Sequence, residues 1–193
     1  MSTKHSKAAA RFIGNRKQEA WHDETLWMVR VKRDKMSHSL PEWERLRELA
    51  CEIKLYSNSH LDVLLEEFEK NATANGAIVH WAKDAAEHNA IVEEILQQHK
   101  AHTLIKSKSM LTEECGMNDY LFGKGYDIIE SDLGERILQW MKLHPSHIVM
   151  PAIHIKRQEV GEMMERVLGT EKGNCAPPYL THAVRKNMRE EFL

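Results

Sequence analysis

The chain has 193 residues, of which 29% are charged and 42% are hydrophobic, and its formal net charge is −2 with histidine neutral. These values are typical of a globular protein with one substantial core, and they give no electrostatic reason to expect nucleic acid or an anionic membrane as a partner. No apolar run approaches the roughly 18 residues of a membrane span, and no signal-peptide pattern is present. We therefore expect a cytoplasmic protein.

The first part of the chain, residues 1–75, predicts a helical N-terminal segment. A charged stretch over residues 15–35 carries spaced apolar side chains and contains no glycine or proline. Ser39 and Pro41 predict the start of a second helix, with Ser39 as its N-cap and Pro41 in the first turn. A further helix is predicted over 61–74, ended by Gly76.

Residues 76–193 follow a different pattern, in which short apolar runs alternate with helical stretches of about a dozen residues. This alternation predicts an α/β domain with a parallel sheet of about four strands and flanking helices. We expect the strands at 77–81, 103–105, 127–130 and 146–153. We expect the intervening and following helices at 84–98, 110–122, from 132 onward, 158–168 and 179–192.

The turn after the second expected strand, Lys106-Ser107-Lys108-Ser109, offers two cations and two hydroxyls. Ligands of open α/β sheets gather outside the carboxyl ends of the strands, and a helix N-terminus there favours an anion. The turn therefore predicts an anion-binding site, although a solvated turn in which Ser109 caps a helix explains it equally well.

Carboxylates follow at the same expected edge of the sheet. Asp132 and Glu135 are candidate ligand-binding residues, and a capping box is their simpler explanation. Glu113 is the candidate catalytic residue, as a proton acceptor, although the helix dipole also favours an acid in the first helical turn.

Metal chemistry is not predicted from the residues of this chain. The three cysteines, Cys51, Cys115 and Cys175, are far apart and form no C-x-x-C pair, so they predict neither a zinc nor an iron–sulfur site. The histidines of residues 144–154 cluster in sequence, but their spacing does not bring them to one point.

Six blocks of the chain, taken together, resemble the lactate-utilization iron–sulfur proteins, the B component of the three-part bacterial L-lactate oxidation system. The later blocks resemble the LUD domain of that family, and the last of them adds His154 to the candidate ligand-binding residues. The blocks are residues 5–13, 22–27, 32–34, 106–114, 132–137 and 145–154.

The resemblance implies a sugar-isomerase/CoA-transferase-like α/β fold and a role in oxidising L-lactate to pyruvate. It also implies that electrons pass through two [4Fe–4S] clusters held by a C-terminal ferredoxin-like region with C-x₂-C-x₂-C-x₃-C-P runs. This chain has no such run. We therefore expect an N-terminal fragment that holds no cofactor, is inactive alone, and meets the other subunits of the lactate-oxidation complex. An incomplete sheet would leave an open edge for homo-oligomer formation.

Two alternative functions remain open at this point. One is a stand-alone isomerase or an acyl- or CoA-handling enzyme on the same fold, with Glu113, Glu114 or Glu135 as the essential carboxylate. The other is a structural assembly module whose helical half, including Trp21 and Trp27, holds partner subunits together.

Overall fold

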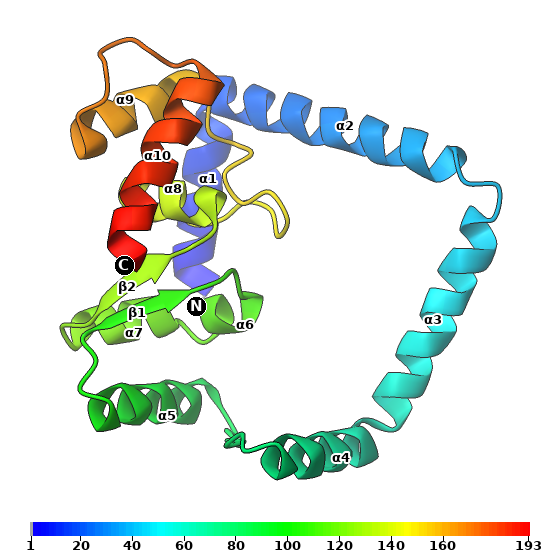
Figure 1. The fold of residues 1–193 in the computed structure, drawn as a ribbon. Helices are drawn as coiled ribbons and strands as arrows, with labels where there is room; N and C mark the ends of the chain where they lie inside the picture. Colours follow the sequence, from blue (N-terminus) through cyan, green and yellow to red (C-terminus); the bar gives the residue numbers. More distant parts are fainter. Residues whose placement is uncertain (1) are drawn as a thin grey trace. The chain divides into compact units, whose positions relative to one another are not determined.

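The computed structural model describes residues 2–193, with side chains from residue 6 onward, and these residues form ten α-helices and two β-strands (Figure 1). The contacts divide the chain into two compact units, which are residues up to Thr25 together with Ala82–Leu193, and residues Leu26–Trp81. The expected division at residue 75 stays a prediction. None of the described helices combines the length and the apolar character that a membrane crossing requires.

The unit of residues 26–81 has no hydrophobic core of its own. It contains the second half of α2 (Arg16–His38), together with α3 (Trp43–Ser59) and α4 (Leu61–Ala74). Neither α3 nor α4 has a buried residue, and many large apolar side chains of this unit are exposed. The predicted helix at 61–74 is confirmed.

Two predictions for residues 26–81 are wrong. Ser39 does not cap α3; its hydroxyl donates to the carbonyl of Met36 at the end of α2, and α3 begins at Trp43 with Glu42 in the N-cap position. Residues 77–81 do not form a strand, because no other segment among the described residues pairs with their backbone. An apolar run becomes a strand only where a partner edge is available.

The other unit is built around two parallel strands, β1 (Thr103–Lys106) and β2 (Asp127–Glu130). Thr103 lies opposite Asp127, and Lys106 lies opposite Glu130. The fold is therefore mostly helical with a two-stranded parallel sheet in the described residues, so the expectation of about four strands is only half met.

Residues 146–153, the other expected strand, form a series of bends followed by a turn instead. The ring nitrogen Nδ1 of His147 accepts hydrogen bonds from the backbone N–H groups of Val149 and Met150, at 3.1 and 3.0 Å. The N–H of Ser146 donates to the carbonyl of Pro151. These local bonds use the backbone groups that a sheet ladder would need.

The expected helix at 110–122 is divided at Gly116 into α6 (Met110–Glu114) and α7 (Met117–Gly123). Gly116 has a φ of +62°, the left-handed conformation that glycine adopts without a steric penalty. The amide of Asn89 donates to the carbonyl of Cys115 at this break, at 2.8 Å. The break turns the chain so that α6 and α7 line one cavity from different directions.

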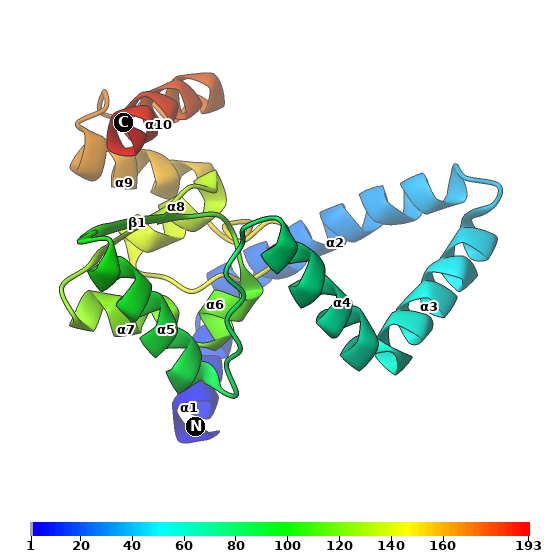
Figure 2. The ribbon, with the colours of Figure 1, turned by 60° about the horizontal axis from the view of Figure 1, so that its bottom comes forward.

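Helices cover both sides of the strands (Figures 1 and 2). On one side, α7 packs on β2 and on α5 (Ala85–Gln98), around Leu96, Leu121 and Ile128. On the other side, α8 (Leu133–Met141) packs on β2 and on α9 (Arg157–Leu168), which also contacts α10 (Pro177–Phe192). The second cluster contains Ile137, Met163, Met164, Leu180, Val184 and Met188.

Candidate functional site

The carboxyl ends of β1 and β2 carry a buried ion pair. Lys106 Nζ lies 2.6 Å from Glu130 Oε1, and the two side chains are only 9% and 2% exposed. The amide of Asn118 on α7 donates to the same carboxylate oxygen at 2.8 Å. The other oxygen, Glu130 Oε2, is buried and has no hydrogen-bond partner among the described residues.

The predicted anion-binding turn has its charges partly neutralised. Lys106 forms an ion pair with Glu130. Lys108 Nζ lies 3.4 Å from the Asp132 carboxylate and donates a hydrogen bond to the carbonyl of Val149 at 3.1 Å. Ser109 accepts a hydrogen bond from the N–H of Thr112 and so caps α6. The exposed groups of the turn are therefore Ser107 and part of Lys108, whose side chain is 25% exposed.

The two expected carboxylates of the second turn have different roles. Asp132 is the N-cap of α8, where its side chain accepts from the N–H of Glu135 at 3.1 Å. Glu135 is buried, and no described group donates a hydrogen bond to its carboxylate. The pKa of Glu135 is raised, first because burial disfavours the charged form and then because the Glu130 and Glu113 carboxylates lie nearby.

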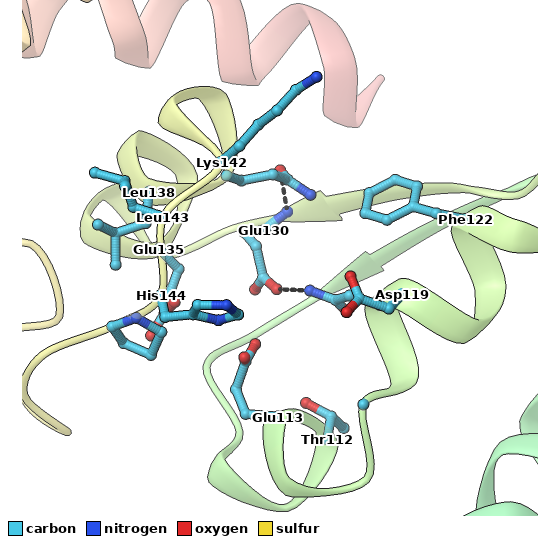
Figure 3. A pocket seen from close by; sticks show the side chains of 14 residues that line it. Thr112, Glu113, Asp119, Phe122, Glu130, Glu135, Leu138, Lys142, Leu143 and His144 are labelled. Carbon is cyan, nitrogen blue, oxygen red and sulfur yellow. Dashed lines mark hydrogen bonds between the residues drawn. The ribbon is translucent and has the colours of Figure 1, made fainter. Parts of the chain in front are cut away.

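A cavity of about 590 Å³ opens beside these groups (Figure 3). Figure 3 shows Glu113 from α6, Glu130 from β2 and Glu135 from α8 around one space. Apolar side chains, including Phe122 and Leu138, form part of its wall. The lining residues are Thr112, Glu113, Gly116, Asn118, Asp119, Phe122, Glu130, Glu135, Leu138, Gln139, Lys142, Leu143, His144 and Pro145.

The candidate residues thus fall into two groups. Glu113 and Glu135 line the cavity, whereas the lysines, the serines and Asp132 of the two turns lie outside its lining. Lys106 reaches the cavity only through its ion pair with Glu130.

His154 belongs to a third location. Its Nδ1 lies 2.7 Å from Ser146 Oγ, and its ring centroid is 6.4 Å from that of His22 on α2. The pKa of His154 is lowered, first by burial and then by the charge of His22. His154 is not among the described residues that line the cavity. Its prediction as a ligand-binding residue therefore rests only on the resemblance of residues 145–154 to the LUD domain.

Reasoning from the sequence missed Glu130 and Asn118, and it considered His144 only as a metal ligand and not as part of the cavity wall. Glu130 had a recognisable signal, because it ends the expected strand at 127–130 just as Lys106 ends the strand before it. Two parallel strands in register place such residues opposite each other. No comparable signal marks Asn118, whose role depends on the break at Gly116.

The described residues do not fit an iron–sulfur cluster. Cys51, Cys115 and Cys175 are free thiols, and no group of three or more His, Cys, Asp or Glu side chains in the described part of the chain could hold a metal ion. A [4Fe–4S] cluster requires four ligands, typically cysteine thiolates.

The two parallel strands have helices on both sides, and the cavity lies at the carboxyl end of β2, where open α/β sheets gather their ligands. The LUD domain family matches residues 65–193, and the chain belongs to this family.

Curated relatives are similar over most of the chain. Lactate utilization protein B of Bacillus pumilus (strain SAFR-032) is 40% identical over 159 residues, which are 81% of this chain and 33% of the relative. Lactate utilization protein B of Macrococcus caseolyticus (strain JCSC5402) is 37% identical over 86% of this chain and 35% of its own length. The uncharacterized electron transport protein YkgF of Escherichia coli (strain K12) is 37% identical over 86% of this chain and 34% of its own.

The resemblance to lactate utilization protein B is thereby confirmed at the level of homology. The chain spans about a third of the length of these curated relatives. No solved structure matches the chain.

Proposed function

We propose that this chain is the N-terminal part of an iron–sulfur electron-transfer subunit that takes part in the oxidation of L-lactate to pyruvate. The observation that carries the proposal is the similarity to lactate utilization protein B over more than four fifths of the chain. The name of the Escherichia coli relative, an electron transport protein, supports the same role. The clusters of such a subunit would lie in the part of the relatives that this chain does not span.

Within this role, the LUD domain binds an anionic group at the turn of residues 106–109. Ser107 is exposed, and Lys108 is held by a single carboxylate contact of 3.4 Å and one carbonyl, so both can reach an anion at modest cost. The anion is a small carboxylate or an acidic side chain of a partner subunit. Lys106 does not contact the anion in this proposal. Its buried ion pair with Glu130 holds the ends of the two strands together and so positions the turn.

Growth on L-lactate tests this function in cells that carry the native gene. Lys108→Ala and Ser107→Ala, introduced at the chromosomal locus, are expected to slow growth on L-lactate and to leave growth on pyruvate unchanged. Deletion of the gene should abolish growth on L-lactate alone. A deletion strain that grows on L-lactate like the parent would overturn the proposed role.

The matched control for the turn is Lys124→Ala. Lys124 is an exposed lysine of the same unit, and it contacts Glu93 at 3.5 Å. This variant should grow normally on both carbon sources. If Lys124→Ala and Lys108→Ala behave alike while the deletion strain fails on L-lactate, the subunit role stands and the anion site does not.

A stand-alone enzyme is the second candidate, and Glu135 is the observation that favours it. A buried carboxyl with a raised pKa beside a cavity has the properties of a general acid or base. Turnover of an acyl-CoA or sugar-phosphate substrate by the purified, iron-free chain, lost in Glu135→Gln, would support this candidate over the first.

A further inference from the structure

The cavity beside β2 has an excess of negative charge. Four carboxylates line it, from Glu113, Asp119, Glu130 and Glu135. Two basic residues, Lys142 and His144, line it as well, but Figure 3 shows the Lys142 ammonium extending away from the carboxylates. Lys106 pairs with Glu130, and Figure 3 shows the His144 ring turned toward the Glu130 and Glu113 carboxylates. The four acids still outnumber the basic groups that face them.

Glu130 supplies a second and independent observation. Its side chain is 2% exposed, and it directs its carboxylate into the space between Glu113 and Asp119 (Figure 3). Oxygen Oε1 accepts from Asn118 and pairs with Lys106, whereas Oε2 has no partner in the described part of the protein. A buried carboxylate oxygen without a donor is costly, so we expect a water or a ligand in the cavity to supply the donor.

The side chains that line the cavity indicate which kind of hydrogen-bond donor could bind there. Phe122, Leu138 and Leu143 give the cavity apolar surface next to its carboxylates. The described side chains do not converge into a set of three or more metal ligands. A volume of about 590 Å³ lies within the range of small-molecule sites. An ammonium group on a short apolar body satisfies all of these features together.

We propose that this cavity binds a small organic cation, whose ammonium group donates a hydrogen bond to Glu130 Oε2 and whose apolar part lies against Phe122, Leu138 and Leu143. The site is separate from the anion-binding turn, so it does not depend on the proposed function. A bound cation would oppose the burial and the carboxylate repulsion that raise the pKa of Glu135.

Three ligands of matched shape test the proposal on the purified 193-residue protein. They are pentylammonium, 1-pentanol and pentanoate, which carry a cation, a neutral donor and an anion on the same apolar chain. Binding is followed by ¹H–¹⁵N NMR titration, read at the amides of cavity residues such as Thr112 and Gly116. Pentylammonium should give saturable shifts and bind at least about fivefold more tightly than 1-pentanol, and pentanoate should not saturate.

Two variants locate the binding. Glu113→Gln removes one carboxylate of the cavity and is expected to weaken pentylammonium binding about fivefold. Glu114→Gln, its exposed neighbour outside the cavity lining, should leave the affinity unchanged. Glu130→Gln should abolish binding if its spectrum shows a folded protein, and Glu113→Gln decides alone if it does not.

Three results would overturn the proposal. They are pentylammonium shifts that do not saturate, an advantage over 1-pentanol below fivefold, and equal losses in Glu113→Gln and Glu114→Gln. Tighter binding of pentanoate than of pentylammonium would show that the cavity prefers anions, and it would also overturn the proposal.

Discussion

Lys106 and Glu130 lie at the same register position on the two parallel strands, and their side chains meet at 2.6 Å. Both are almost fully buried, so each charge depends on the other for compensation. Removing two charges from water costs free energy that can exceed their mutual attraction, so the pair need not stabilise the fold relative to two apolar side chains. What it fixes is the relative position of the two strand ends, which also places Glu130 beside the cavity.

Lys106→Met is expected to lower the free energy of unfolding by about 3–5 kcal/mol, because it leaves Glu130 buried without its cation. Urea denaturation at neutral pH measures the change. Lys108→Met is the matched control; Lys108 is a quarter exposed, and its pair with Asp132 should contribute less than about 1 kcal/mol. Similar losses in the two variants would show that the buried pair has no special structural role.

The raised pKa of Glu135 predicts that this residue makes the folded state less stable at neutral pH than under mildly acidic conditions. Its pKa in the folded protein lies above the ordinary value of 4.5, so the folded state binds this proton more tightly than the unfolded state does. The contribution of Glu135 to stability therefore falls as pH rises from 4.5 through the raised pKa. Glu135→Gln should increase stability at pH 8 and reduce this pH dependence.

The exposed Glu114, at the end of α6, is the control for that measurement. Glu114→Gln should leave the slope of stability against pH unchanged between pH 4.5 and 8. If Glu135→Gln is less stable than the parent at pH 8, the ionised Glu135 carboxylate makes a stabilising contact and the account of its burial is wrong.

His154 has the opposite pH dependence. Its pKa in the folded protein is lowered below 6.5 by burial and by His22, so the unfolded state binds this proton more readily. Stability should therefore fall as pH drops through 6.5 toward the lowered pKa. His154→Gln should lose less stability between pH 7.5 and 5.5 than the parent does, whereas His182→Gln, an exposed site on α10, should match the parent.

Helices α3 and α4 should exchange their amide hydrogens faster than α9 and α10, by at least about tenfold. No residue of α3 or α4 is buried, whereas α9 and α10 bury Met163, Met164, Leu180 and Val184. Helices of this length without a packed face are marginally stable in water. Hydrogen-exchange mass spectrometry of the purified chain measures the difference, and equal protection would mean that another surface covers α3 and α4.

The sequence predicted best those features that depend on neighbours along the chain. Ser109 and Asp132 were expected to cap helices, and both do so, because a cap needs only a backbone N–H two or three residues later. Strands were also predicted at 103–105 and 127–130, and these are the two segments that pair as β1 and β2.

The features that the sequence could not supply depend on contacts between distant residues. The same apolar run predicts a strand at 103–105 and at 146–153, but only the first has a partner, and His147 binds the backbone of the second. Lys106 and Lys108 were predicted to bind an anion, because the carboxylates that pair with them, Glu130 and Asp132, are more than twenty residues away in the chain. Burial of such pairs cannot be read from composition.

The most direct test of the proposed role is the mass, iron and acid-labile sulfide of the native protein, isolated without oxygen from its source cells. We predict a polypeptide well above 22.4 kDa that contains about eight irons, as two cubane clusters require. An iron-free native protein of 22.4 kDa would contradict the electron-transfer role and leave the LUD domain as a ligand-binding domain without clusters.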